Sequence, residues 1–277
     1  MRALRFVLVS LGIFFGIVYV LFLAYAYFNQ ESMIFFPSKL NKDYPFHFEQ
    51  PFEEMTIVAP DNTKLNGLLF TTPHSKGLVF YLHGNAGALD TWGDIAPIYT
   101  GLGYDIFILD YRGFGKSDGT IESEKQFFAD VSAAYRQLTR RYPENQTIVI
   151  GYSIGSGLAA YLASQNHPAT LILQAPYYSL TELADTRIPF IPDFLKKYHF
   201  ETHEFIQKAK CPIYIFHGDA DQVIAYDNSV RLRKLLKPGD RFLTLKGQPH
   251  QSVNDNPEFQ SELKIILDTL ALQKTTP

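Results

Sequence analysis

The sequence is almost free of cysteine. Cys211 is the single cysteine among 277 residues, so no disulfide can form within the chain, and cysteine usage does not report the redox compartment. Cys211 precedes Pro212 at the start of an apolar run, which predicts a small buried residue. Cysteine and histidine spacings typical of zinc sites are absent as well.

The sequence also lacks an excess of either charge. It contains 25 Lys and Arg residues against 28 Asp and Glu residues, for a formal net charge of −3, and it has no basic run. Nucleic acid is therefore not an expected partner. Hydrophobic residues make up 46% of the chain, which is enough for one sizeable core. A single domain is expected, because α/β folds of about 200–250 residues often form one.

Charge is missing altogether between Phe6 and Phe28, a stretch of 23 predominantly apolar residues. A helix needs about 20 such residues to cross the hydrocarbon core of a bilayer. A cleaved signal peptide is the alternative, because residues 24–26 resemble a cleavage site. The apolar core of a signal peptide usually has only about 7–15 residues, however. We therefore predict a transmembrane signal-anchor within residues 1–30, followed by a domain of residues 31–277.

Basic residues flank the two ends of this stretch unequally. Arg2, Arg5 and the N-terminal amine lie beside it, whereas Lys39 and Lys42 lie further from its other end. The positive-inside rule then favours a cytoplasmic N-terminus and an extracytoplasmic catalytic domain. The segment 31–37 is expected either to lie along the membrane surface or to tuck under the domain.

Beyond this point, short apolar segments that predict strands alternate with segments of helical period. The predicted strands are residues 55–59, 64–71, 77–82, 104–109, 147–150, 170–174, 213–216 and 241–245. The predicted helices are residues 90–102, 121–141, the segment after Ser153, 226–236 and 257–272. This alternation predicts an α/β fold, a mostly parallel eight-stranded sheet with helices on both faces.

One interval breaks the alternation. Residues 179–210 contain no clear strand, and they include the apolar, proline-broken run 188–195. Such an insertion after a strand is expected to form a short lid over a site, at about residues 180–210, or else to pack on the core as a structural excursion.

A G-x-S-x-G pattern lies between a predicted strand and a predicted helix. Gly151 and Gly155 flank Ser153 two residues away on either side. In this context the serine stands at the apex of a strained turn. A side chain at either glycine position would collide where the strand and the helix cross. The N-terminal amides of the helix would face the space in which negative charge develops when an acyl carbon is attacked.

Four strand ends carry polar or glycine-rich clusters, and another follows the last strand. These clusters lie at residues 83–85, 110–113, 151–155, 217–221 and 247–252. Ligands gather at the carboxyl ends of strands in such sheets. In chain order the clusters supply an oxyanion loop, a serine, an acid and a histidine, which is the order of α/β-hydrolases.

The chain resembles the α/β-hydrolase superfamily, in particular its single-pass, membrane-anchored members with a serine-aminopeptidase-like domain. The resemblance extends from about Met33 to the C-terminal helix. It rests on HGNAG at 83–87, DYRGFGKSDG at 110–119, GYSIGSG around Ser153, HGDADQVI at 217–224 and GQPH ending at His250. It implies a serine hydrolase, and the family includes esterase, lysophospholipase and protein-deacylase activities.

Each expected role follows from chemistry. Ser153 is the nucleophile and needs a base, for which His250 is the candidate. The histidine needs an acid, and by spacing alone both Asp219 and Asp221 qualify. The family pattern HGxxDxxV selects Asp221, which leaves Asp219 as a turn residue that bonds local backbone. The oxyanion donors are expected to be the backbone N–H groups of Ile154 and Asn85.

Other polar residues near these positions are expected to be structural. His83 and His217 would bond backbone around the site, and Asp110 and Arg112 would pair to brace their loop.

The sequence thus predicts a membrane-anchored serine hydrolase that cleaves esters or thioesters, including lipid or acyl-chain substrates, and that needs no cofactor. Peptidase activity is the alternative, but the insertion carries acidic and basic residues in mixture and does not decide it. A membrane-tethered scaffold without activity is the third hypothesis, because fold alone does not imply function. The sequence does not indicate an oligomeric state.

Overall fold

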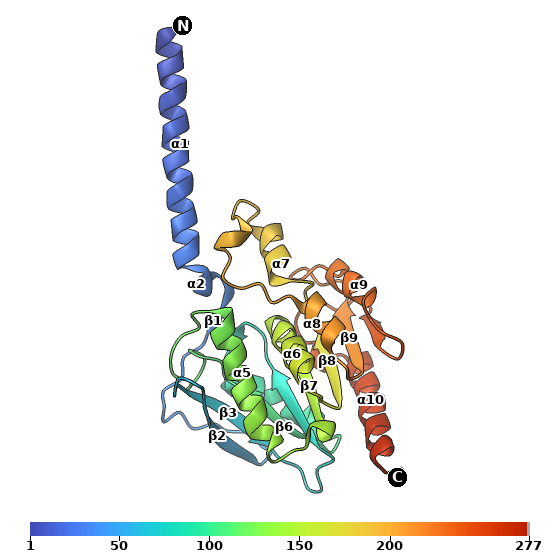
Figure 1. The fold of residues 1–277 in the computed structure, drawn as a ribbon. Helices are drawn as coiled ribbons and strands as arrows, with labels where there is room; N and C mark the ends of the chain where they lie inside the picture. Colours follow the sequence, from blue (N-terminus) through green and yellow to red (C-terminus); the bar gives the residue numbers. More distant parts are fainter. Residues whose placement is uncertain (276–277) are drawn as a thin grey trace.

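Eight strands form one twisted sheet at the centre of the molecule (Figure 1). The computed structural model describes residues 1–275, so residues 276 and 277 of the predicted domain lie outside the described residues. The spatial order is β10-β9-β8-β7-β4-β6-β3-β2. The strands are β2 Phe52–Val58, β3 Lys64–Phe70, β4 Leu78–Leu82, β6 Asp105–Leu109, β7 Thr147–Tyr152, β8 Thr170–Gln174, β9 Ile213–Gly218 and β10 Arg241–Leu245. Neighbours are parallel except β2 with β3 and β3 with β6, which confirms the predicted mostly parallel sheet.

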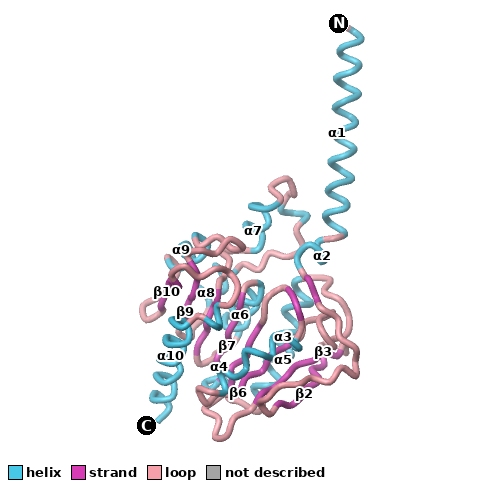
Figure 2. The backbone as a smooth tube through the Cα atoms, turned by 180° about the vertical axis from the view of Figure 1, so that it is seen from behind, coloured by secondary structure: helices cyan, strands magenta, loops and turns pink. Residues whose placement is uncertain are grey.

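Helices cover both faces of the sheet. In Figure 1 α5, α6 and α8 lie over one face, and Figure 2 shows α3, α4 and α10 over the other. Apart from two helices described below, the helices of the domain are α3 Leu89–Trp92, α4 Ala96–Thr100, α5 Glu124–Thr139, α6 Ile154–Gln165, α8 Thr202–Lys208, α9 Asp227–Arg233 and α10 Pro257–Thr275. Because strand side chains alternate between faces, Phe80 and Phe107 enter one hydrophobic cluster while Tyr81 and Ile108 enter the other. Cys211 is buried in the first cluster, as predicted.

The observed helices differ in their bounds from the predicted ones, and two of the differences have a clear local cause. Helix α5 begins at Glu124 instead of residue 121, because the Ser123 side chain caps it by accepting the N–H of Gln126 at 3.2 Å. The segment predicted as one helix over 90–102 is helical but not continuous. It is divided into α3, a 3-10 turn (Gly93–Ile95) and α4. Pro97 stands in the first turn of α4, where a helix tolerates a residue without an N–H. For the same reason Pro97 cannot donate the hydrogen bond that would continue the preceding helix.

A long N-terminal helix, α1 (Arg2–Phe28), stands away from the rest of the molecule (Figure 1). Its apolar side chains are largely exposed. Within residues 1–275 it is the one helix long and apolar enough to cross a membrane. A membrane anchor and a signal sequence both have this form.

The segment after α1 is tied to the domain. A short helix, α2 (Gln30–Ile34), leads into β1 (Phe36–Pro37), which pairs in parallel with β5 (Ala86–Gly87). The N–H of Phe36 donates to the carbonyl of Asn85 at 2.8 Å. Of the two placements expected for residues 31–37, the structure shows the one against the domain.

The insertion of residues 179–210 contacts this same segment. It runs through α7 (Leu180–Arg187) and a 3-10 turn (Asp193–Leu195) to α8, and α7 stands beside α2 in Figure 1. Gln30 is buried and holds the insertion at two points. Its Nε2 donates to the carbonyl of Leu195 at 2.7 Å, and its Oε1 accepts the N–H of Lys197 at 2.9 Å.

The expected pairing of Asp110 with Arg112 is wrong. The buried Arg112 guanidinium instead donates to Asp130 at 2.8 Å and to Asp61 at 2.7 Å, which joins α5 to the β2–β3 turn. Asp130 is also buried, with 2% of its side chain exposed. Asp61 and Asp130 lie 51 and 18 residues from Arg112, so no local pattern indicated these partners.

We expect Arg112→Ala to lower the free energy of unfolding by about 3–5 kcal/mol, because it leaves the Asp130 carboxylate buried without its partner. The matched control is Arg141→Ala. It removes an exposed ion pair to Glu53 and should cost less than about 1 kcal/mol. Urea unfolding of the two variants measures the difference, and equal losses would contradict this account.

Candidate active site

Ser153 occupies a strained turn between β7 and α6. Its backbone is left-handed, with φ 54° and ψ −121°, which is costly for a residue with a side chain. The close crossing of strand and helix permits this turn. A Cβ on Gly151 would lie 2.3 Å from the carbonyl oxygen of Gly155, and a Cβ on Gly155 would lie 2.1 Å from that of Leu82. A side chain at either glycine would therefore collide with a backbone carbonyl, as the sequence predicted.

The structure brings Ser153, His250 and Asp221 together in one hydrogen-bonded row. His250 Nε2 lies 2.9 Å from Ser153 Oγ, and His250 Nδ1 lies 2.7 Å from Asp221 Oδ2. All three residues are buried. These partners assign the tautomer, because Nδ1–H donates to the carboxylate and leaves Nε2 free to accept the serine proton.

The Asp221 carboxylate is held from several directions. Its Oδ1 accepts the N–H groups of Val223 at 2.8 Å and Ile224 at 2.9 Å. Burial acts to raise the pKa of Asp221, but hydrogen bonds from His217 and His250, the charge of His250 and the Ile224 N–H outweigh it. They hold the pKa well below its usual value. Asp221 therefore stays ionised wherever the protein is folded near neutral pH.

Asp219 contacts the loop of residues 247–252, which carries His250, and not the His250 side chain. Its Oδ1 accepts the N–H of Gly247 at 2.6 Å. The expectation that it bonds local backbone is thus corrected: the backbone lies 28 residues away. On the other side of the loop, the Tyr152 hydroxyl donates to the carbonyl of His250 at 2.7 Å. These two contacts position the loop that carries His250.

His217 has a larger part in the site than the sequence indicated. It bonds the carbonyl of Ile224 at 3.0 Å, as expected of a structural histidine, but the same Nε2 lies 3.1 Å from Asp221 Oδ2. Because Nε2 faces two oxygen acceptors it carries the proton, which leaves Nδ1 to accept the hydroxyl of Ser229 at 2.6 Å. The signal available in the sequence was its place four residues before Asp221 at one strand end.

His83 bonds backbone, as expected, with Nδ1 2.7 Å from the carbonyl of Gly84. Complete burial lowers the pKa of His83 to about 4. Burial also raises the pKa of Asp110 well above its usual value, and its carboxylate lies 3.9 Å from His83 Nε2. Both side chains therefore favour their neutral forms beneath the site.

Asn85 and Ile154 both line the space beside Ser153, the former from the loop after β4 and the latter at the start of α6. The Asn85 side chain turns away and donates to the carbonyl of Ile34 at 2.9 Å. The backbone carbonyl oxygen of Asn85 accepts the N–H of Phe36. The loop with the expected oxyanion donor is thus held by the segment that follows α1.

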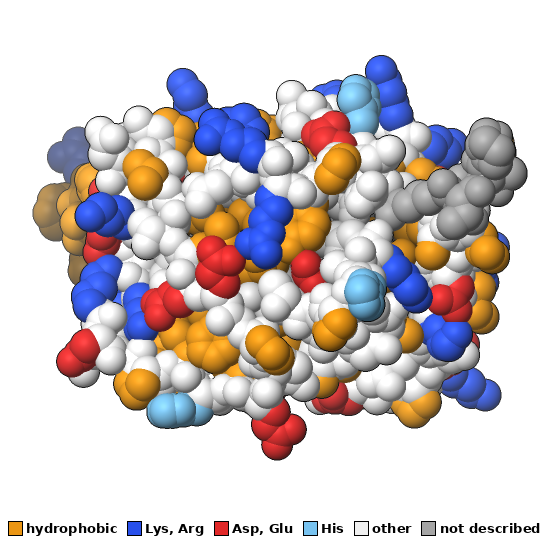
Figure 3. Space-filling view, turned by 90° about the horizontal axis from the view of Figure 1, so that it is seen from below, with side chains coloured by type: hydrophobic (Ala, Val, Ile, Leu, Met, Phe, Trp, Pro, Cys, Tyr) orange, Lys and Arg blue, Asp and Glu red, His pale blue; other side chains and the backbone are white. Residues whose placement is uncertain are grey.

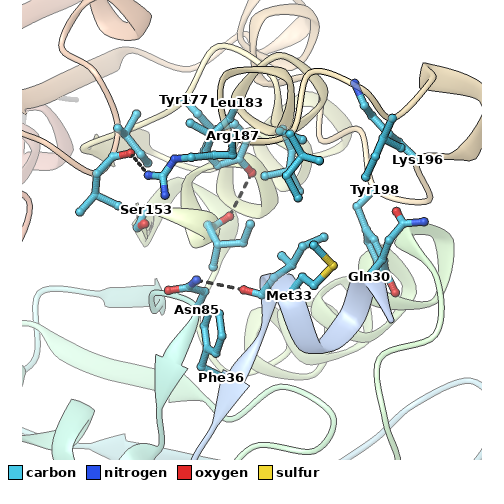
Figure 4. A pocket seen from close by; sticks show the side chains of 18 residues that line it. Gln30, Met33, Phe36, Asn85, Ser153, Tyr177, Leu183, Arg187, Lys196 and Tyr198 are labelled. Carbon is cyan, nitrogen blue, oxygen red and sulfur yellow. Dashed lines mark hydrogen bonds between the residues drawn. The ribbon is translucent and has the colours of Figure 1, made fainter. Parts of the chain in front are cut away.

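A cavity of about 300 Å³ opens beside Ser153 between α2 and the insertion (Figure 4). Its walls are mainly apolar, from Met33, Ile34, Phe36, Tyr177, Leu180, Leu183, Ala184, Ile188, Ile191, Tyr198 and Ile224. Among the described residues that line it, the charged ones are Arg187 and Lys196. The Arg187 guanidinium donates to the carbonyl of Val223 at 2.7 Å. The insertion therefore forms one wall of a cavity that reaches Ser153.

Ser153 also borders a second cavity, of about 470 Å³. Its lining contains more polar side chains, including Thr91, Asp94, Gln251, Ser252 and Asn254, together with His250. Ser153 thus stands between an apolar space and a space with many hydrogen-bonding groups.

A strained serine at a strand-to-helix turn, on a mostly parallel sheet covered by helices on both faces, is the arrangement of hydrolases of the α/β-hydrolase type. Comparison with known proteins agrees. The family described as serine aminopeptidase, S33, matches residues 73–202. The human alpha/beta hydrolase domain-containing protein 17B is 33% identical over 220 residues, which cover 76% of this chain and 73% of that protein. The chain therefore belongs to the α/β-hydrolase superfamily.

Other similar proteins extend this result. An uncharacterised protein of Mycobacterium tuberculosis is 27% identical over 251 residues, covering 87% of this chain and 86% of its own length. Among solved structures, an esterase of Pyrococcus furiosus has a TM-score of 0.66 at 18% identity, over 87% of this chain and 97% of the esterase. At that identity the likeness shows the fold alone.

The lowered pKa of Asp221 predicts how stability depends on pH. A carboxylate with a depressed pKa in the folded state stabilises the protein above the unfolded-state pKa of about 3.9, and this stabilisation is lost as the pH falls through the folded-state value. The wild type should therefore be more stable than Asp221→Asn at pH 7, and this advantage should shrink below about pH 4. Thermal unfolding from pH 7 to pH 3 measures it, and a constant difference would contradict the assignment.

Proposed function

We propose that this protein is a serine hydrolase that cleaves ester or thioester bonds through an acyl-Ser153 intermediate. The observation that carries the proposal is the hydrogen-bonded row from Ser153 Oγ through His250 to Asp221, at 2.9 Å and 2.7 Å. The order of these three residues along the chain is that of α/β-hydrolases.

The geometry supports a role for each group. His250 Nε2 takes the proton of Ser153 as its oxygen attacks the acyl carbon, and Asp221 stabilises the imidazolium that forms. The N–H groups of Asn85 and Ile154 bind the oxyanion at the positive end of α6. His250 then gives its proton to the leaving group, and water, activated by the same histidine, releases the acid. His217 positions Asp221 without touching the substrate.

The two cavities suggest where the two halves of the substrate bind. The apolar cavity between α2 and the insertion suits an acyl chain, because its walls are aliphatic and aromatic. The cavity with more polar side chains beside His250 suits the leaving group and the attacking water. This division favours lipid or other acyl-chain esters, with the insertion as a lid over the acyl site.

Peptidase activity is the second candidate, and the cavity disfavours the aminopeptidase form. A substrate ammonium group needs a carboxylate in reach, and the charged residues in the described lining of the apolar cavity are basic, Arg187 and Lys196. Asp94 and Asp255 line the second cavity instead. A scaffold without activity is also disfavoured, because the strained Ser153 backbone and the aligned His250 have a cost that binding alone does not explain.

We further propose that α1 anchors the protein in a membrane, with a cytoplasmic N-terminus and an extracytoplasmic catalytic domain. The uncharged stretch and the neighbouring Arg2 and Arg5 support this orientation. We place the boundary between the anchor and the catalytic domain between residues 30 and 31. The two parts are nevertheless in contact there, because Gln30, on the anchor side, hydrogen-bonds the insertion of the domain.

The first test is labelling by a fluorophosphonate probe together with hydrolysis of p-nitrophenyl butyrate. Ser153→Ala should abolish labelling, and Asp221→Asn should lower kcat by about 10⁴-fold because the histidine loses its orienting carboxylate. Asp219→Asn is the matched control and should change kcat little, since its amide oxygen still accepts the Gly247 N–H. Equal labelling of wild type and Ser153→Ala, or a larger loss in Asp219→Asn, would sink the assignment. Faster turnover of aminoacyl anilides than of esters would favour the peptidase.

A second test concerns acyl-chain length. Ala184 lines the apolar cavity from α7, whereas Thr186 on the same helix is exposed. We expect Ala184→Trp to lower kcat/KM for dodecanoyl esters by about 10-fold or more, with a smaller effect on butyrate, because the indole fills the cavity. Thr186→Trp should leave the preference unchanged. Equal effects of Ala184→Trp on both chain lengths would rule out this cavity as the acyl site.

A further inference from the structure

We propose that the tip of the insertion, residues 188–195, lies in the lipid bilayer beside α1, and that the apolar cavity takes its acyl chain sideways from the membrane. This inference rests on the proposed anchor and the proposed hydrolase. It adds a second membrane-contacting element, far from α1 in sequence, and a route for the substrate.

The tip has the composition and exposure of a lipid-facing segment. Its eight residues, Ile-Pro-Phe-Ile-Pro-Asp-Phe-Leu, include seven apolar ones. Phe190 is 70% exposed and Phe194 is 83% exposed. Exposed aromatic side chains gathered in this way mark an interaction surface. The single charge, on Asp193, is paired with Lys196 at 2.6 Å.

The tip reaches α1 within the apolar stretch of that helix. The Tyr19 hydroxyl donates to the carbonyl of Phe190 at 2.8 Å, across 171 residues of sequence. At about 1.5 Å per residue, Tyr19 lies roughly 13 Å along the helix from Phe28. A bilayer that encloses residues 6–28 therefore also encloses the tip where it contacts Tyr19, within the hydrocarbon and below the interface, a depth at which phenylalanine side chains are favourable.

Part of the backbone of the tip is hydrogen-bonded within the protein. Irregular backbone at membrane depth requires that its polar groups be satisfied within the protein. Pro189 and Pro192 have no N–H to satisfy. The N–H groups of Ile188, Ile191 and Leu195 donate to backbone carbonyls. The carbonyls of Phe190 and Leu195 accept from Tyr19 and Gln30, both of which belong to the anchor side.

The same tip forms a wall of the acyl cavity. Ile188 and Ile191 line the cavity, while Phe190 and Phe194 between and beside them point to the exposed surface. The opposite wall comes from Met33 and its neighbours in α2, directly after the anchor (Figure 4). An acyl chain that leaves the bilayer between the tip and α2 thus meets apolar side chains as far as Ser153.

The described surface at the other end of the molecule carries many charged side chains between its apolar patches (Figure 3). Seen from the side away from α1, acidic and basic side chains are interspersed over the visible face (Figure 3). The bilayer therefore contacts the end that carries α1 and the tip. The occupant we assign to the exposed phenylalanines is lipid hydrocarbon.

A spin label tests the depth of the tip in the full-length protein, reconstituted in phosphatidylethanolamine–phosphatidylglycerol vesicles. The single cysteine makes this direct: in a Cys211→Ala background, Phe194→Cys carries the label. Ile265→Cys, on exposed α10, is the matched control. The measured quantity is the ratio of the label's collision rate with oxygen to its collision rate with a water-soluble nickel chelate. We expect this ratio to be roughly tenfold higher at residue 194 than at residue 265. Equal ratios at the two positions would overturn the proposal, whether or not the protein is active.

Activity tests the route of the acyl chain. Phe190→Ser with Phe194→Ser should lower hydrolysis of a long-chain ester embedded in the same vesicles by about tenfold. Turnover of soluble p-nitrophenyl butyrate should stay unchanged, since neither residue lines the cavity. Ile265→Ser should alter neither rate. Phe190→Leu with Phe194→Leu should keep the hydrolysis of the embedded long-chain ester at the wild-type rate. Equal losses on both substrates, or the same loss in the leucine variant, would overturn lateral entry. Absence of all ester turnover in the wild type would refute the proposed hydrolase, while the label would still decide the position of the tip.

Discussion

The site depends on one backbone constraint, the left-handed conformation of Ser153. It persists because β7 and α6 cross with only hydrogen atoms on Gly151 and Gly155 between them and the neighbouring carbonyls. The turn places Ser153 directly before the first amides of α6, at the positive end of that helix. Burial of β7 between two hydrophobic clusters supplies the rigidity that keeps this strain in place.

A second group of contacts converges on one carboxylate. Asp221 receives two histidines and two backbone N–H groups, so its negative charge is fixed in direction as well as in protonation state. The loop with His250 is in turn held by Tyr152, the residue before the nucleophile. Ser153, His250 and Asp221 follow three different strands, yet they are linked: His250 contacts both of the others, and its loop is held by the residue before Ser153. The geometry is therefore cooperative, and single contacts cannot be assigned independent energies.

The sequence predicted what local patterns can encode. Strand runs, the glycine-bounded turn and the order of polar strand ends led to the eight-stranded sheet and to the residues that meet around Ser153. It did not predict contacts between distant residues without a pattern. Arg112 binds Asp61 and Asp130 instead of Asp110, and Gln30 binds the insertion 165 residues away. The break in the helix predicted over 90–102 coincides with Pro97 in the first turn of α4, where the missing N–H interrupts the helical hydrogen bonds although the apolar spacing continues.

The β1–β5 pairing determines how rigidly the proposed anchor would hold the domain. A flexible linker would let a domain tumble above a membrane and sample it with any face. Here Phe36 and Ser38 donate backbone hydrogen bonds into the loop that carries Asn85, directly after α2. With α1 in a bilayer, the domain keeps one height and one tilt, and its remaining freedom is rotation about the membrane normal and lateral diffusion. Encounter with a lipid substrate of the kind proposed would then be a search in two dimensions, limited to molecules in the leaflet next to the domain.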